Sequence, residues 1–191
     1  MSPINVPNVI TLIRIITIPF IVGIFYFPDE LISFSAKNVT ATAIFIFAAV
    51  TDWLDGYLAR KLNQMSAFGA FLDPVADKLF VVGALVILLF LGRVDPLVAL
   101  IIIGREIAIS ALREWMAKMG QARSVAVAFI GKLKTTVQMV AIPLLLYNEY
   151  LFDLIDTQWL GTILINVAAV LTVASMLYYL RKALPYALNS R

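Results

Sequence analysis

One stretch of this sequence places four carboxylates between long apolar runs. It extends from Asp52 to Lys78, reads DWLDGYLARKLNQMSAFGAFLDPVADK and contains Asp52, Asp55, Asp73 and Asp77. Ionised side chains in apolar surroundings are costly unless they face a cavity, a partner or a metal ion. Four carboxylates close together would also repel one another unless a cation lay among them. The chain is therefore expected to bring these side chains into one polar site.

The spacing of the aspartates is helical. Asp52 and Asp55 are three residues apart, and Asp73 and Asp77 are four apart, so each pair lies on one face of a helix. Two helices that met along these faces would direct four carboxylates into one pocket.

Small residues extend both aspartate faces. Gly56 and Ala59 continue the face of the first pair, and Gly69 lies one turn before the second pair. These residues would leave room for a bulky ligand near the backbone. Arg60, one residue past Ala59, could reach a phosphate group.

The apolar segments on both sides of this stretch predict a membrane protein. Hydrophobic residues make up 62% of the 191-residue chain, and the mean hydropathy is +0.93, whereas ordinary globular domains are about 45–50% apolar. We expect an all-α, polytopic membrane fold with residues 1–191 as a single domain. A short N-terminal interfacial segment would precede six transmembrane helices at about residues 9–26, 39–60, 71–91, 96–119, 128–147 and 160–180, with polar loops at 27–38 and 148–159.

Two residue types that dominate many metal and catalytic sites are missing from the sequence. It contains neither cysteine nor histidine, which removes thiolate ligands, the commonest transition-metal ligand and the commonest general base. A bound metal would be held mainly by oxygen, which favours Mg²⁺ or Mn²⁺. A carboxylate is then the available general base.

The aspartate stretch follows a known pattern. It reads D-x-x-D-G-x-x-A-R, then eight residues, then G-x-x-x-D-x-x-x-D, and it resembles the signature of the CDP-alcohol phosphotransferase family. The resemblance implies that an alcohol attacks the β-phosphorus of a CDP-linked donor and displaces CMP, with two divalent ions bound. It also implies a homodimer. The roles it implies are metal ligation by Asp52, Asp55 and Asp73, general base catalysis by Asp77 with a share in the second ion, and CDP binding by Gly56, Ala59, Arg60 and Gly69.

Three less specific sequence segments elsewhere in the chain suggest which alcohol is the acceptor. NVPNVITLIRIITIP, SALREWMA and KTTVQMVAIP resemble the branch of the family that joins CDP-diacylglycerol to sn-glycerol 3-phosphate and yields phosphatidylglycerophosphate. The same chemistry with inositol phosphate or serine as acceptor stays open. A cation transporter is the alternative from another class, because intramembrane aspartates also mark ion pathways.

An acceptor that carries a phosphate needs fixed cations. Arg105 and Arg113 share one face of the fourth predicted span, and Lys134 lies on a polar face of the fifth. Arg14 is a fourth candidate, although an arginine near a helix end can also extend its charge to lipid headgroups. Asn8 and Thr11 share its face at spacings of three and could line the same pocket.

The charges of the loops predict an orientation. Lys118, Lys132, Lys182 and other basic residues fall on the side of both termini and of the aspartates, whereas most acidic loop residues fall on the other side. By the positive-inside rule this side is cytoplasmic. With the family resemblance, we expect a protein of a bacterial cytoplasmic membrane whose partners are the lipid bilayer and a second copy of the chain, with no nucleic acid among them.

Overall fold

The computed structural model is mostly helical. It describes residues 6–62, 67–121 and 129–188, and within them it leaves out the side chains at 6–8, 10, 53–62, 67–68, 70 and 187. The described residues form six helices and one two-stranded hairpin: α1 (Val6–Ile24), α2 (Phe34–Leu62), α3 (Ala67–Phe90), α4 (Pro96–Lys118), α5 (Phe129–Tyr147), β1 (Tyr150–Leu151), β2 (Ile155–Asp156) and α6 (Thr157–Leu188).

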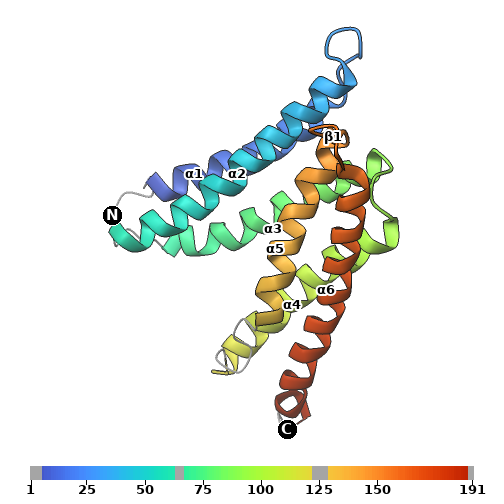
Figure 1. Cartoon of the computed structure of the whole chain (residues 1–191). Helices are drawn as coiled ribbons and strands as arrows, with labels where there is room; N and C mark the ends of the chain where they lie inside the picture. The colour runs from blue at the N-terminus through green and yellow to red at the C-terminus, as the bar shows by residue number, and fades with distance from the viewer. Residues whose placement is uncertain (1–5, 63–66, 122–128, 189–191) are drawn as a thin grey trace.

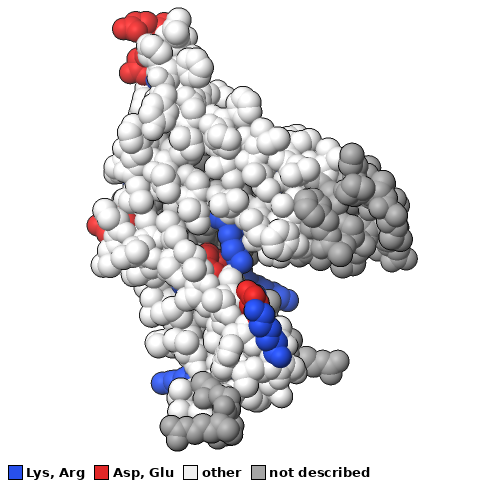
Figure 2. Space-filling model, turned by 180° about the vertical axis from the view of Figure 1, so that it is seen from behind, with Lys and Arg blue, Asp and Glu red and all other residues white. Residues whose placement is uncertain are grey.

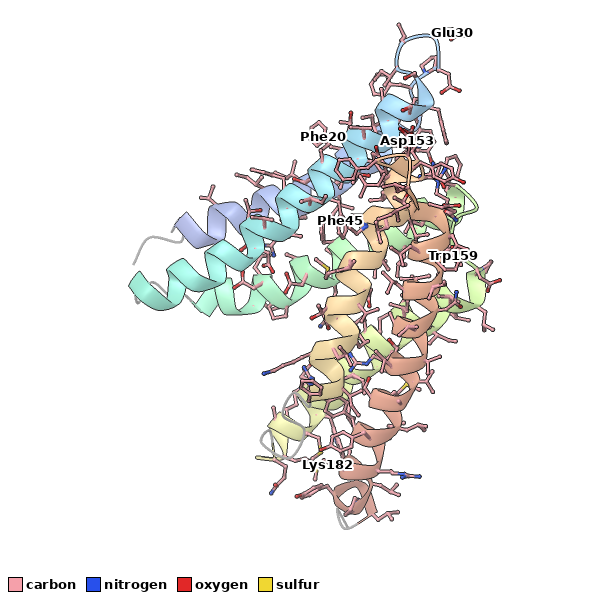
Figure 3. The ribbon with its side chains drawn as sticks, in the orientation of Figure 1. Phe20, Glu30, Phe45, Asp153, Trp159 and Lys182 are labelled. Atoms are coloured by element: carbon pink, nitrogen blue, oxygen red, sulfur yellow. The ribbon has the colours of Figure 1, made fainter. Side chains whose placement is uncertain are left out.

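The helices form two arms that diverge from a common end (Figure 1). Helix α1 packs on α2 and α3, while α6 packs on α4 and α5, and α2 contacts α5 between the two sets. We call α1–α3 the aspartate arm and α4–α6 the basic arm. Figure 3 shows Glu30 and Asp153 near the joined end of the arms and Lys182 near the far end of the basic arm.

Aromatic and small residues set the packing inside the aspartate arm. Phe45 of α2 stacks on Phe80 of α3, with ring centroids 4.5 Å apart, in the main hydrophobic core. A Cβ added to Gly83 of α3 would lie 2.5 Å from Cγ2 of Ile18 of α1. The glycine therefore allows these two helices to approach more closely than any larger residue would.

Arg93, in the turn between α3 and α4, ties the arms together at their joined end. Its guanidinium donates to the carbonyl oxygens of Leu145 and Leu146 at 3.0 and 2.7 Å and to Oδ1 of Asn38 at 2.8 Å. Those carbonyls belong to the last turn of α5, where no intrahelical donor is left. Burial lowers the pKa of Arg93 to about 10, so the side chain stays protonated at neutral pH.

Local sequence signals explain several helix ends. Gly92 and Gly120 adopt positive φ angles of 67° and 72° after α3 and α4. At each, the glycine N–H and the next N–H bond back to the last helical turn, the pattern of a Schellman C-terminus. Asp95 caps the start of α4 by accepting from Leu97 N at 2.8 Å, and Pro96 occupies the first turn.

Within the described residues, three segments are long and apolar enough to cross a membrane: Phe34–Asp52, Phe129–Tyr147 and Thr157–Tyr186. The described part of α1 that qualifies as apolar, Thr11–Ile24, is shorter. Helices α3 and α4 contain the charged residues of the site, such as Asp73, Asp77 and Arg105. These charged residues make α3 and α4 resemble membrane spans less than the three segments above do.

Several expected boundaries differ from the structure. The loop expected at 27–38 is shorter, because α2 begins at Phe34 and Ser33 caps it by accepting from Ala36 N at 3.3 Å. The loop expected at 148–159 contains the β1–β2 hairpin, and α6 already begins at Thr157. Each error lies in a polar segment, where hydropathy does not report hydrogen bonding.

Candidate functional site

Arg14 joins the two aspartate helices. One guanidinium nitrogen, Nη1, lies 2.5 Å from Oδ1 of Asp52 on α2 and 2.7 Å from Oδ1 of Asp77 on α3. The Arg14 side chain is 3% exposed, whereas the Asp52 and Asp77 side chains are 46% and 54% exposed. The two carboxylates therefore converge on a buried positive charge while they remain accessible to a ligand.

Helix α1 also binds a third aspartate of the motif, Asp73. Thr11, one turn before Arg14 on α1, donates its hydroxyl to Oδ1 of Asp73 at 2.7 Å. Thr11 is buried and Asp73 is exposed. Thr11 and Arg14 are thus grouped with the aspartates, and α1 forms one wall of the site.

Several predicted site residues have side chains outside the described set. Asp55, Gly56, Ala59 and Arg60 belong to α2, and Asn8 belongs to α1. Gly69 on α3 is described and is buried. The roles proposed for these residues remain predictions.

The donor set of the aspartate site fits a hard divalent cation. Its groups are carboxylate oxygens, which suit Mg²⁺ or Mn²⁺, and two of them already gather around one positive nitrogen. Among the described residues no three acidic side chains come close enough to form a ligand set, and the Asp55 side chain lies outside that description. Asp52 and Asp77 are the described residues best placed to hold such an ion.

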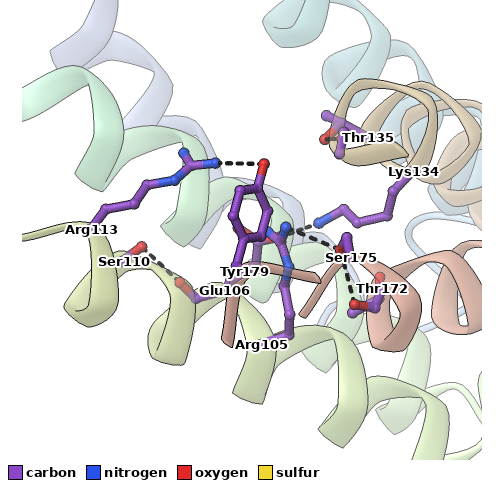
Figure 4. Close-up of polar contacts among 10 residues, drawn as sticks. Arg105, Glu106, Ser110, Arg113, Lys134, Thr135, Thr172, Ser175 and Tyr179 are labelled. Atoms are coloured by element: carbon purple, nitrogen blue, oxygen red, sulfur yellow. Dashed lines mark hydrogen bonds and ion pairs between the residues drawn. The ribbon is translucent and has the colours of Figure 1, made fainter. Parts of the chain in front are cut away.

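A second charged cluster lies in the basic arm (Figure 4). Lys134 of α5 and Arg105 of α4 both pair with Oε1 of Glu106, Arg105 Nη1 at 3.3 Å. Arg105 also donates to Oγ of Ser175 at 3.2 Å. We call Arg105, Arg113, Lys134 and Glu106 the basic cluster.

Tyr179 of α6 packs against the basic cluster. Arg113 Nη2 donates to its hydroxyl at 3.3 Å, and the guanidinium carbons of Arg113 and Arg105 lie 5.3 and 5.8 Å from its ring centroid. Cations within about 6 Å of an aromatic face are attracted to it. Three of the four cations predicted to bind an acceptor phosphate therefore come together here, whereas Arg14 lies with the aspartates.

Two adjoining cavities connect the clusters. The central cavity, about 260 Å³ in volume, is lined by Asp77 and Lys78 of the aspartate arm and by Glu106, Lys134 and Gln138 of the basic arm, among others. The second, about 170 Å³, is lined by Arg14, Asp52 and Asp77. Figure 2 shows basic side chains along the notch between the arms. A ligand in the central cavity would therefore face Asp77 on one side and Lys134 on the other.

Sequence reasoning missed Glu106 of the basic cluster and Tyr179, which packs against it. Glu106 lies beside Arg105 in an apolar segment, and an ionisable residue in that setting could have been flagged as functional. Tyr179 carries no such signal, because one tyrosine near the end of an apolar helix is typical of a membrane interface.

Comparison with known proteins agrees with this site. The family model described as CDP-alcohol phosphatidyltransferase matches residues 4–174. A protein of Escherichia coli (strain K12) is 50% identical over 181 residues, and one of Salmonella choleraesuis (strain SC-B67) is 49% identical over 181 residues, each comparison covering 94% of both chains. Both relatives are named CDP-diacylglycerol–glycerol-3-phosphate 3-phosphatidyltransferase. The resemblance carried by the Asp52–Asp77 pattern is confirmed, and the chain belongs to the CDP-alcohol phosphatidyltransferase family.

Proposed function

We propose that this protein transfers a phosphatidyl group from CDP-diacylglycerol to sn-glycerol 3-phosphate, giving phosphatidylglycerophosphate and CMP. The observation that carries the proposal is that one cavity is lined by an accessible carboxylate, Asp77, and by a buried cation, Lys134. The first could accept a proton from an attacking hydroxyl, and the second could bind a phosphate on the same acceptor. The names of the relatives support this donor and this acceptor.

In the reaction, the primary hydroxyl oxygen of the acceptor forms a bond to the β-phosphorus of the donor. The bond from that phosphorus to the oxygen bridging the two phosphates breaks, and CMP leaves with the electron pair. Asp77 takes the hydroxyl proton, as a positioned general base. Lys134, Arg105 and Arg113 hold the acceptor phosphate so that the hydroxyl points towards the donor, and positioning of this kind supplies much of the catalysis in phosphoryl transfer.

The aspartate site would hold the diphosphate end of the donor. We propose two Mg²⁺ or Mn²⁺ ions held by Asp52, Asp55 and Asp73, with Asp77 sharing the second. When bound, such ions neutralise the diphosphate and the leaving phosphate. Gly56, Ala59, Arg60 and Gly69 would accommodate the cytidine and its phosphates.

The protein is also proposed to be a membrane-embedded homodimer. All six helices span a bacterial cytoplasmic membrane as part of a homodimer, with the open ends of both arms at the cytoplasmic face. The clustering of acidic residues such as Glu30 and Asp153 at the joined end (Figure 3) and of Lys118 and Lys182 at the other end supports this orientation by the positive-inside rule.

The test is release of CMP from CDP-diacylglycerol in detergent micelles with Mg²⁺ or Mn²⁺. We would offer sn-glycerol 3-phosphate, inositol phosphate and serine in parallel. Release with sn-glycerol 3-phosphate alone, abolished by EDTA, is the expected result. CMP release with inositol phosphate or serine would overturn the proposal that sn-glycerol 3-phosphate is the acceptor. Ion flux in proteoliposomes without any CMP release would favour an ion pathway instead.

A further inference from the structure

The basic cluster contains a carboxylate at the point where an anionic ligand would bind. Oε1 of Glu106 accepts from Nζ of Lys134 and from Nη1 of Arg105. The two cations come from different helices, α5 and α4, so this single oxygen brings their charges together. We propose that Glu106 occupies the phosphate position between Lys134 and Arg105 until the phosphate of the acceptor displaces it, and so selects acceptors that carry a phosphate dianion.

Burial explains why the site needs such an occupant. The side chains of Lys134 and Arg105 are 3% and 8% exposed, and buried charges are costly unless they are paired. Within the described part of the chain, Glu106 is the acidic member of each of their ion pairs. Without a bound anion, Glu106 is therefore the group that keeps two buried cations compatible with an apolar helix bundle.

Unused donors in the same cluster point to a ligand with more acceptor atoms than one carboxylate. The buried Nε atoms of Arg105 and Arg113 have no hydrogen-bond partner among the described atoms. An arginine presents several donors in a fixed planar arrangement that matches phosphate oxygens. A phosphate in this position could accept from both guanidinium groups and from Lys134, whereas Glu106 leaves both Nε donors unsatisfied.

Among the ion-paired residues Glu106, Lys134 and Arg105, the most exposed side chain is also the one that could move. Glu106 is 20% exposed and lines the central cavity together with Lys134 and Asp77. Two anions on the same cations would repel each other, so an entering phosphate would push the carboxylate away from Lys134. A phosphate dianion gains enough from the two cations to offset this displacement, and a neutral hydroxyl compound such as glycerol does not.

The inference rests on the proposed function, and Glu106→Gln tests it. The amide keeps the shape of the side chain and removes its charge, so phosphate no longer competes with a resident anion. We expect the KM for sn-glycerol 3-phosphate and the Ki of inorganic phosphate, as a competitor of that acceptor, each to fall about tenfold, equivalent to ~1.4 kcal/mol. A rise or no change in both constants would overturn the proposal, because a purely structural ion pair predicts a loss of phosphate binding once Lys134 is unpaired.

Glu114→Gln is the matched control. Glu114 lies on the same helix and pairs with Lys118 at 2.8 Å, but both side chains are largely exposed, and both constants should stay at the wild-type values. If Glu106→Gln does not fold, Glu106→Asp replaces it. The shorter carboxylate reaches Lys134 less well, so a smaller fall in both constants is expected, and a rise would again overturn the proposal.

A donor-free measurement separates this inference from the proposed function. Inorganic phosphate should raise the melting temperature of the detergent-solubilised protein by binding the folded state. Glu106→Gln should reach half of this stabilisation at about one tenth of the phosphate concentration, which corresponds to the same ~1.4 kcal/mol. This shift is expected even if the wild-type protein released no CMP with sn-glycerol 3-phosphate, and equal phosphate dependence of both proteins would overturn the role of Glu106 alone.

Discussion

The two arms of the molecule carry charged clusters of opposite composition. In the aspartate arm a single arginine, Arg14, lies between Asp52 and Asp77. In the basic arm a single glutamate, Glu106, lies between Lys134 and Arg105. Each cluster therefore contains one residue with the same charge as its proposed ligand. Arg14 is positive like a metal ion, and Glu106 is negative like the acceptor phosphate.

The clusters differ in which member is exposed. Arg14 is 3% exposed and its carboxylates are about half exposed, whereas Glu106 is 20% exposed and its cations are at most 8% exposed. The aspartates can therefore meet hydrated ions and a nucleotide directly. Lys134 is buried and lines the central cavity beside the glutamate. This difference suits the CDP end of a lipid-linked donor on one side and selection of a small phosphorylated acceptor on the other.

The largest expected effect is loss of the carboxylate shared by both cavities. Asp77→Asn removes the proposed base without changing the size of the side chain, and general base catalysis contributes about 10²–10⁴-fold. We expect CMP release to fall by about 10³-fold. Asp153→Asn, an exposed change in the hairpin, serves as the control and should leave the rate unchanged. A rate for Asp77→Asn within tenfold of wild type would assign the proton to another group.

A smaller effect is expected from the basic arm, because its cations bind the acceptor and are not proposed to take part in bond breaking. Lys134→Met removes one charge-assisted hydrogen bond to phosphate, worth about 1.5–3 kcal/mol. The KM for sn-glycerol 3-phosphate should rise by about 10–100-fold, measured at saturating CDP-diacylglycerol. Lys118→Met, on the exposed surface, should leave KM unchanged. A fall in kcat with an unaltered KM would move Lys134 from acceptor binding to the chemical step.

Removal of Arg14 tests the aspartate arm in the same way. Arg14→Met leaves Asp52 and Asp77 facing each other without their shared cation, and repulsion should destabilise the folded state. Half-exposed carboxylates are partly screened by water, so we expect a loss of about 2 kcal/mol, less than for a fully buried pair.

Thermal unfolding in detergent, with and without Mg²⁺, measures the effect of Arg14→Met. Mg²⁺ should restore more stability to the variant than to the wild type, because it can neutralise the same carboxylates. The exposed change Arg181→Met should show the wild-type response. Equal Mg²⁺ stabilisation of wild type and Arg14→Met would mean that the arginine and the ion do not share a site.

The smallest effect concerns packing inside the aspartate arm and not charge. Gly83→Ala places a methyl group 2.5 Å from Cγ2 of Ile18, and overpacking of this kind typically costs about 1–3 kcal/mol. We expect about 1 kcal/mol, seen as a lower melting temperature with Asp77-dependent CMP release retained. Gly23→Ala has open space around its Cβ and should not lower the melting temperature. A stability of Gly83→Ala equal to that of Gly23→Ala would show that α1 and α3 can separate without cost.

Sequence and structure contributed differently to the two arms. Helical spacing placed Asp52 and Asp77 on helix faces that meet at Arg14, as expected of ionised side chains in apolar helices, which need a polar partner. Spacing also paired Arg105 with Arg113 on one helix. Boundaries were less accurate, as the early start of α2 at Phe34 and the unexpected β1–β2 hairpin demonstrate.

By itself the sequence determined the membrane class, the helical architecture and the family, since each follows from hydropathy or from spacing within one helix. Which residues hold a cation stays a prediction. Only the tertiary structure decided that Arg14 belongs with the aspartates, that Glu106 holds Lys134 and Arg105 together, and that Arg93 joins the arms. Those contacts link residues between one and 63 positions apart. The physical reason is that periodicity reports which residues share a face of one helix, whereas the partner across a helix interface depends on how the arms pack.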